Sequence, residues 1–278
     1  MIPKPKVLVL KADGTNCDEE LYFAFKLSGG DPKIVHVNEL RNKQESLKRY
    51  NILAIPGGFA YGDDIVSGKI LAVELTSFFS EELKKFTERK DTLIIGICNG
   101  FQVLVRTGLL PFGTMSEMQA TLTNNDSGHF ECRWINLKIN PNSKCVFLNG
   151  LNTSDGGRLS EREAMTPPRW IVSFQVAHGE GKFFASNETI KTMEQSNLIV
   201  FRYVDDKGKP TQKYPDNPNG SLHAIAGITD PTGRILGLMP HPERFVRIEQ
   251  HPNWRRMKIP KPQGLPIFGN MIKYIKNE

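Results

Sequence analysis

Between residues 93 and 105 the chain changes abruptly from a strand pattern to a helix pattern, and this change constrains the fold more than any other feature. Its first part, Leu-Ile-Ile-Gly-Ile, is short and apolar, as buried strands are. After Cys98 the apolar residues recur at helical spacing, and Gly108 provides a stop. The sequence therefore places Cys98 at a sharp strand-to-helix turn.

Two glycines flank this turn. Gly96 and Gly100 stand two residues before and after Cys98, which is the thiol counterpart of the Gly-x-Ser-x-Gly nucleophile elbow. A strained turn needs neighbours without a Cβ, and the N-terminus of the following helix favours a thiolate. The spacing predicts that Cys98 is a catalytic nucleophile. A buried structural cysteine is the alternative.

Strand and helix patterns alternate through the first hundred residues. We expect strands at residues 7–10, 34–37, 52–55 and 93–97, with helices between them, the first beginning near Asp18. The strands are apolar without alternation, which is typical of a doubly wound α/β fold with a mostly parallel sheet. The turns at 13–16, 56–59 and Cys98 should then lie at one edge of the sheet, where sites form.

The second half of the chain has a different pattern. We expect five further strands at residues 130–139, 170–176, 198–204, 223–229 and 234–239, added as an antiparallel region, and a last helix at 267–276. Residues 154–169 form a polar excursion. No linker or shift in composition separates the halves, so residues 1–278 are predicted to be a single domain.

Composition limits the classes of function. The chain has 278 residues, a net charge of +6 and a pI near 9.1. Its basic residues are mixed with acids, as at 81–90, and the more basic stretch at 255–261 accompanies no nucleic-acid motif, so no nucleic-acid partner is expected. No apolar run suits a membrane span or a signal peptide. The four cysteines have no metal-ligand spacing, which predicts no metal and a reducing cytoplasm.

A thiol nucleophile needs a base, and His241 is the first candidate. It follows an apolar strand, and Glu243 stands two residues on. Pro242 should keep this segment extended, so that both side chains project to one side and form a pair in which the carboxylate orients the imidazole. His178 is the rival base, although a structural or partner-facing role suits it better. Cys17 is the rival nucleophile.

Two backbone amides are candidates for an oxyanion hole. The glycine pair at 57–58 ends the strand expected beside the nucleophile strand, so Gly58 could turn its N–H into the site. The second donor would be the N–H of Asn99, directly after the nucleophile. A plain tight turn at the glycine pair is the alternative.

Four motifs at residues 56–63, 96–102, 177–181 and 239–244 together resemble the glutaminases of phosphoribosylformylglycinamidine (FGAM) synthase, within the class I (triad) glutamine amidotransferases. The resemblance implies a flavodoxin-like fold. It also implies that Cys98 forms a γ-glutamyl thioester with L-glutamine, assisted by His241 and Glu243. Gln102 and Phe59 would hold the substrate.

The same resemblance implies a partner. Ammonia would pass to a separate synthetase subunit (PurL) that uses ATP and Mg²⁺ to convert formylglycinamide ribonucleotide to its amidine in purine biosynthesis. A small PurS subunit is left open. This chain has no phosphate-binding loop, so it should need no cofactor of its own. The isolated chain should be a poor glutaminase, because an unpartnered site would waste glutamine.

Three other interpretations stay open at this point. The chain could be a class I glutaminase that serves a different synthetase. It could be a cysteine hydrolase of the DJ-1/PfpI type, whose elbow is similar but which usually lacks the downstream His-Pro-Glu. It could also be a non-enzymatic partner module, although such a module has no physical need for Cys98, His241 and Glu243 together.

Overall fold

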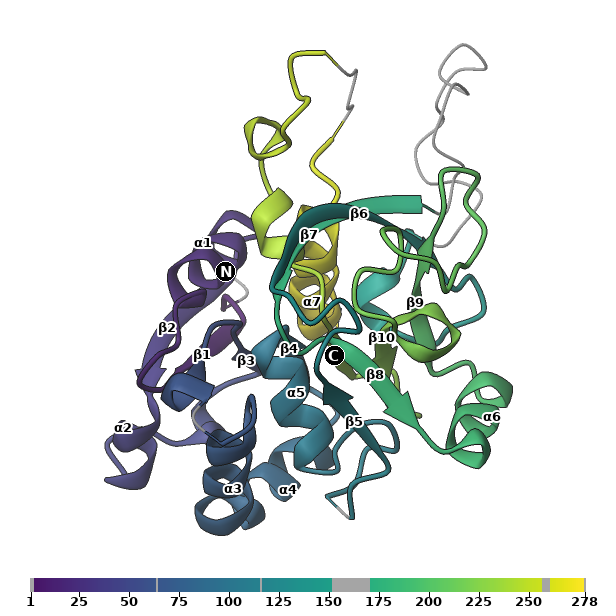
Figure 1. Cartoon of the computed structure of the whole chain (residues 1–278). Helices are drawn as coiled ribbons and strands as arrows, with labels where there is room; N and C mark the ends of the chain where they lie inside the picture. The colour runs from purple at the N-terminus through teal and green to yellow at the C-terminus, as the bar shows by residue number, and fades with distance from the viewer. Residues whose placement is uncertain (1–2, 64, 116, 152–170, 257–260, 278) are drawn as a thin grey trace.

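A computed structural model describes residues 3–63, 65–115, 117–151, 171–256 and 261–277. Across these residues a nine-stranded sheet runs in the order β2-β1-β3-β4-β11-β10-β9-β6-β7 (Figure 1). The strands are β1 (Lys6–Lys11), β2 (Asp31–His36), β3 (Ile52–Ile55), β4 (Leu93–Ile97), β6 (Glu131–Ile139), β7 (Ile171–His178), β9 (Ile199–Val204), β10 (Ile225–Thr229) and β11 (Ile235–Leu238). A separate antiparallel pair joins β5 (Ala120–Thr123) and β8 (Lys182–Ala185).

The half of the sheet from β2 to β11 is parallel. Strand β3 pairs with β4 and β4 with β11, and every residue of these three strands is buried. Burial on both faces explains why their sequences are apolar without alternation. The predicted doubly wound α/β fold is confirmed, and β3 lies beside the nucleophile strand as expected.

Helices cover both faces of this half. They are α1 (Asp18–Leu27), α2 (Val37–Arg41), α3 (Lys69–Phe78), α4 (Ser80–Glu88), α5 (Asn99–Arg106) and α7 (Leu265–Asn277), whereas α6 (Asn187–Gln195) lies beside the antiparallel half. Helices α1 and α7 contact each other, with the Phe25 and Phe268 rings edge to face at 5.1 Å. Helices α3 and α5 pack together apart from them (Figure 1). The apolar faces of α1 and α7 therefore pack against each other in one layer of the core.

The other half of the sheet, from β10 to β7, is antiparallel, as predicted. The strand expected at 234–239 differs from this prediction, because β11 pairs in parallel with β4 and antiparallel only with β10. A turn at 230–233 joins β10 to β11, with the Gly233 N–H donating to the Asp230 carbonyl at 3.0 Å. The sequence interpretation missed β5, β8 and α6. The two strands have only four residues each, and α6 is mostly polar, with Ser186 as its N-cap accepting from the Thr189 N–H at 3.1 Å. Such short or polar elements carry little periodic signal.

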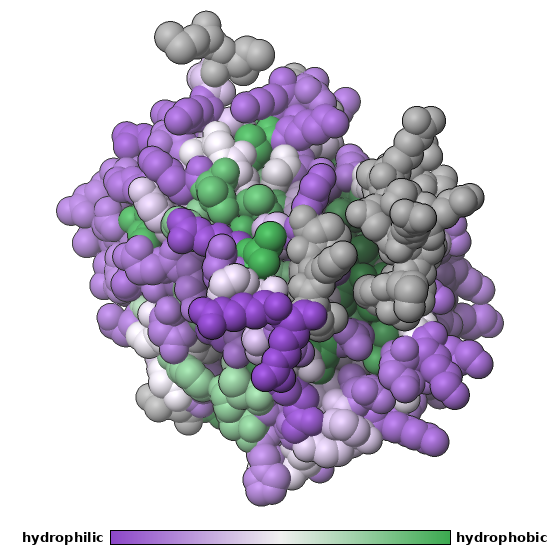
Figure 2. All heavy atoms as spheres, turned by 90° about the horizontal axis from the view of Figure 1, so that it is seen from above, coloured by the Kyte–Doolittle hydropathy of each residue, from purple (hydrophilic) through white to green (hydrophobic). Residues whose placement is uncertain are grey.

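The sequence analysis also made predictions about membrane spans, the polar excursion and the domain organisation. No helix within the described ranges is long and apolar enough to cross a membrane. Hydrophilic side chains dominate the face in Figure 2, and apolar side chains gather there only in separate areas. The polar excursion at 154–169 lies outside the described residues, as does part of the basic stretch at 255–261. The single-domain assignment stays a prediction.

Candidate active site

The turn at Cys98 has the strained backbone that the elbow pattern predicts. Cys98 joins the end of β4 to the start of α5, with φ of 54° and ψ of −107°. A positive φ is costly for a residue with a Cβ and persists only where the surrounding structure holds it. The turn thereby presents the thiol at the carboxyl edge of the sheet, in front of the first turn of α5.

The flanking glycines are required by close approach of the backbone. A Cβ on Gly96 would lie 2.4 Å from the Gly100 carbonyl oxygen, and a Cβ on Gly100 would lie 2.0 Å from the Ile55 carbonyl oxygen. Both distances are far below van der Waals contact. Because of these two glycines, α5 begins directly against β3 and β4, and the turn closes without a larger loop.

The nucleophile and its candidate base come from neighbouring strands. The Cys98 N–H donates to the Leu238 carbonyl at 2.8 Å, which ties the elbow to the end of β11. Three residues later His241 follows, and its N–H donates to the Gln175 carbonyl of β7 at 2.8 Å. A Cβ on Gly57 would lie within 3.2 Å of both the His241 ring and the Cys98 Cβ, so both side chains line one small space.

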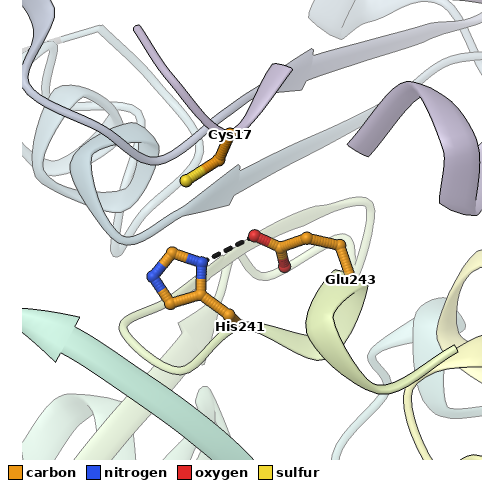
Figure 3. A group of neighbouring side chains, drawn as sticks. All are labelled: Cys17, His241 and Glu243. Carbon is orange, nitrogen blue, oxygen red and sulfur yellow. Dashed lines mark hydrogen bonds and ion pairs between the residues drawn. The ribbon is translucent and has the colours of Figure 1, made fainter. Parts of the chain in front are cut away.

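His241 and Glu243 form the predicted pair. The His241 Nδ1 lies 2.6 Å from the Glu243 Oε1, and each side chain is only 1% exposed (Figure 3). The predicted reason was wrong. Pro242 begins a 3₁₀ turn over Pro242–Phe245 and does not extend the chain. Proline suits the first position of such a turn because its missing N–H has no partner there, and the turn brings the carboxylate back to the ring.

The charge state of His241 follows from this pairing. Burial alone would lower the pKa of His241, but the Glu243 carboxylate, helped by the Cys17 and Cys98 sulfurs, raises that pKa well above 6.5. The pairing therefore favours the imidazolium, the form that can donate a proton to a leaving group. Its Nε2 is buried and has no hydrogen-bond partner among the described residues.

Both predicted oxyanion donors lie at this edge. Asn99 is the first residue of α5, so its backbone N–H is among the free donors of the first turn. Gly58 has φ of 127° and pairs with Thr15 in an isolated bridge. The turns at 13–16 and 56–59 thus meet beside Cys98, as the fold predicted. Whether these donors bind an oxyanion stays a prediction.

A buried polar network, which the sequence interpretation did not anticipate, supports α5. The Asn99 side chain donates to Asp63 at 3.1 Å and to Gln102 at 3.0 Å, and Gln102 donates to the Glu180 carbonyl. Asp63 in turn accepts from Ser67 at 2.8 Å. The Gln102 amide therefore braces the loop after β7, and direct contact with glutamine stays a prediction.

A pocket of about 510 Å³ opens beside this network. Phe59 and Phe130 lie on it with their ring centroids 6.2 Å apart, and both rings are partly exposed. Glu180, two residues after His178, also lines it, and the Cys98 thiol donates to the Ala177 carbonyl at 3.6 Å. The loop after β7 therefore lines this pocket and also contacts the nucleophile, although Cys98 is not one of the residues that line the pocket.

His178, the rival base, is a structural residue in this arrangement. It is 3% exposed, its Nδ1 lies 3.1 Å from the Asn125 Oδ1, and its Nε2 lies 3.5 Å from the Asn219 Nδ2. Burial, with the nearby positive charge of His241, lowers the pKa of His178 to about 3. The ring is neutral and held between amides, and its burial argues against a partner-facing role.

Cys17, the rival nucleophile, lies within the same site. It stands at the N-cap position of α1 without a capping hydrogen bond from its side chain, it is buried, and its sulfur accepts from the Arg244 Nη2 at 3.2 Å. Burial raises the pKa of the Cys17 thiol despite its contact with His241. Cys17 lies in the turn directly after β1. Because the carboxyl ends of parallel strands meet at one edge of the sheet, this position in the sequence already indicated where Cys17 would lie.

Comparison with known proteins agrees with this geometry. The family model of the CobB/CobQ-like glutamine amidotransferase domain matches residues 4–275. Phosphoribosylformylglycinamidine synthase subunit PurQ of Dehalococcoides mccartyi is 45% identical over 274 residues, covering 98% of each chain. The PurQ subunit of Methanococcus maripaludis is 38% identical over 284 residues, covering 97% of each.

Solved structures show the same fold. A chain in the structure of PurLQS from Thermotoga maritima matches with a TM-score of 0.70 and 29% identity, covering 98% of this chain and 99% of that one. A glutamine amidotransferase of Thermotoga maritima matches with a TM-score of 0.51 at 15% identity, which shows the fold alone.

Proposed function

The chain belongs to the PurQ family of glutamine amidotransferases, and on this premise we propose how its site releases ammonia. The chain is the glutaminase subunit of FGAM synthase, and a PurL-type synthetase subunit is its partner. The observation that carries the mechanism is the buried His241–Glu243 pair at 2.6 Å beside the strained elbow at Cys98.

The reaction begins at the thiol. The thiol proton of Cys98 passes to His241, whose imidazolium form the Glu243 carboxylate stabilises, and the sulfur attacks the side-chain amide carbon of glutamine, while the developing oxyanion accepts from the backbone N–H groups of Gly58 and Asn99. The His241 imidazolium donates a proton to the departing nitrogen, so ammonia leaves and a γ-glutamyl thioester remains. Glu243 holds the Nδ1 proton and thereby fixes the orientation of the ring.

Hydrolysis then restores the site. His241, now neutral, takes a proton from water as the water attacks the thioester carbon, and glutamate leaves as the sulfur departs. Gln102 and Phe59 hold the substrate in the pocket beside α5. The partner synthetase uses ATP and Mg²⁺, and this chain requires neither. A third subunit of the PurS type is compatible with the match to PurLQS.

The four cysteines support a cytoplasmic location. All of them are free thiols, including the exposed Cys132. A reducing compartment keeps such thiols free and keeps the nucleophile active.

A glutamine-mimicking diazoketone tests the mechanism. After incubation with and without the synthetase, mass spectrometry should find one adduct on Cys98, increased by the partner and prevented by excess glutamine. His241→Ala should abolish the adduct. An adduct on Cys17 would move the nucleophile, and absence of any adduct would favour a cysteine hydrolase or a scaffold.

A further inference from the structure

Asn125 is a buried residue that the mechanism does not use. It lies in the loop 124–130 between β5 and β6 and is only 4% exposed. Its side-chain nitrogen donates to the His178 carbonyl at 2.7 Å and to the His129 carbonyl at 2.9 Å. Its side-chain oxygen accepts from the Gly181 N–H at 3.0 Å. A single amide therefore bridges the loop after β5 and the loop after β7.

The segment 179–181 lies outside the sheet. Pairing with β6 holds β7 as far as His178, and β8 begins only after this segment. Asn125 binds the segment at both ends, because its backbone N–H donates to the Gly179 carbonyl at 2.9 Å and its side chain accepts from Gly181. Both of these end residues are glycines, which restrict the backbone least. The position of the segment therefore depends on Asn125.

Both bridged loops line the pocket of about 510 Å³. Two of its residues belong to the loop after β7 and four to the loop after β5: Gly179, Glu180, Asn124, Gly128, His129 and Phe130. Asn125 itself is buried behind them and is not among the residues that line the pocket. Its amide therefore sets the distance between two walls of the pocket from behind.

The two ends of this amide are not interchangeable. The nitrogen faces two carbonyl groups, which can only accept, and the oxygen faces a backbone N–H, which can only donate. The oxygen also lies 3.1 Å from the His178 Nδ1, so that the ring can donate to it. A carboxylate of the same shape could accept these bonds but could not donate to either carbonyl.

The nucleophile is held by other contacts. The Ala177 carbonyl accepts from the Cys98 thiol, and Ala177 lies within β7, where it pairs with β6. Glu180 lies beyond the end of β7, and its carbonyl accepts from the Gln102 side chain. Loss of the Asn125 amide should therefore displace Glu180 and leave the surroundings of the thiol in place.

We propose that Asn125 is a positioning residue for glutamine, which acts through the segment 179–181 and sets KM. The proposal rests on the proposed function, because it takes glutamine as the ligand of this pocket. Loss of a residue that serves binding raises KM and leaves kcat unchanged. Loss of a residue that only stabilises the fold would reduce the amount of active protein, which lowers the apparent kcat and leaves KM unchanged.

Steady-state kinetics of the complex with the synthetase test this role. Asn125→Asp and Asn125→Ala should each raise KM for glutamine about tenfold or more, since buried carbonyls lose their donor, and keep kcat within about threefold. Asn140→Asp is the matched control, because Asn140 also donates to a backbone carbonyl, that of Ile199 at 3.0 Å, but at the opposite end of β6 from Phe130. Thermal melting checks that each variant is folded. Unchanged KM in both Asn125 variants, or an equal rise in Asn140→Asp, would overturn the proposal.

Two reagents that label Cys98 separate binding from chemistry. Iodoacetamide is small and needs no substrate pocket, whereas a glutamine-mimicking diazoketone does. Asn125→Asp should slow labelling by the diazoketone about tenfold and leave labelling by iodoacetamide unchanged. Equal slowing with both reagents would place the effect on the thiol itself and overturn the proposal.

Hydrogen exchange of the segment 179–181 tests the bridge without glutamine. Exchange should be faster in Asn125→Asp than in the unaltered chain, because the Gly181 N–H and its loop are held less firmly. Unchanged exchange would contradict the bridge. Faster exchange in the variant, together with an unaltered complex that releases no glutamate, would overturn the proposed function and the choice of glutamine as the ligand, but not the bridge.

Discussion

Glu243 acts through one oxygen atom, which lies 2.6 Å from the His241 Nδ1. Its charge outweighs the effect of burial and raises the pKa of His241. An amide in its place could still accept the hydrogen bond, but it could not stabilise the imidazolium. A substitution of Glu243 by glutamine therefore separates the effect of the carboxylate charge from the effect of the hydrogen bond to His241.

Glu243→Gln is expected to lower kcat for glutamine hydrolysis in the complex by about 10²–10⁴-fold, as loss of the charge does in other triads. Glutamate release gives the rate. Glu249→Gln is the matched control, because Glu249 is exposed in the next turn. Retention of more than a third of the activity by Glu243→Gln would show that the carboxylate is not needed.

His178 links stability to pH. Its pKa of about 3 in the folded chain lies below the ordinary value of 6.5. Between these values the unfolded chain binds more protons, so stability is complete above pH 6.5 and declines as the pH falls. From pH 7 to pH 5 this single group should cost about 2 kcal/mol of the free energy of unfolding.

Urea unfolding at pH 7 and pH 5 measures this effect. His178→Gln should be less stable at pH 7, because the ring fits between two amides, but its loss of stability toward pH 5 should be about 2 kcal/mol smaller. The exposed His129→Gln should behave like the unaltered chain. Equal pH dependence in His178→Gln and the unaltered chain would contradict a neutral buried ring.

The packing of α5 against the sheet depends on a glycine. Gly100 lies in its first turn, and a Cβ there would lie 2.0 Å from the Ile55 carbonyl oxygen of β3. Backbone cannot move aside as the end of a flexible side chain can. The helix would have to shift away from the sheet and take the Cys98 turn with it.

Gly100→Ala is therefore expected to lower the free energy of unfolding by about 1–3 kcal/mol and to remove the diazoketone adduct on Cys98. Gly269→Ala in α7 is the matched control, since nothing lies within 4 Å of a Cβ there. It should raise stability by up to about 1 kcal/mol, because alanine favours helix more than glycine. Equal stability of the two variants would show that the contact at Ile55 is not restrictive.

At the scale of the whole molecule, the site joins both halves of the sheet. The parallel half supplies Cys98. The antiparallel half supplies the Ala177 carbonyl, which accepts from the thiol, and the loop after β7 supplies Glu180, which lines the pocket. A partner that contacts the exposed mouth at Phe59 and Phe130 would hold both walls together.

Adding the synthetase subunit should raise kcat/KM for glutamine hydrolysis about tenfold or more, within the usual range of coupling between sites. The isolated chain and the complex are compared by glutamate release at equal chain concentration. Phe59→Ser should weaken the association, while Phe184→Ser, an exposed phenylalanine of β8, serves as the control. High turnover by the isolated chain would contradict partner dependence.

The sequence alone predicted the parts that depend on local pattern. The elbow at Cys98 follows from two glycines and a change of period, and the His241–Glu243 pair follows from spacing at a strand end. Both depend on residues close together in the chain. For the same reason the parallel strands could be predicted from their unbroken apolar runs.

Only the tertiary structure decided which distant residues meet. It placed Cys17 against His241, enclosed His178 between Asn125 and Asn219, and bound Gln102 to the Glu180 carbonyl. It also replaced the expected extended segment after His241 with a 3₁₀ turn. These features depend on contacts between segments that can be more than two hundred residues apart, as Cys17 and His241 are, and no periodicity in the sequence encodes such contacts. Local sequence pattern therefore determined which residues carry the chemistry of this protein. Packing between remote segments determined which other residues surround them.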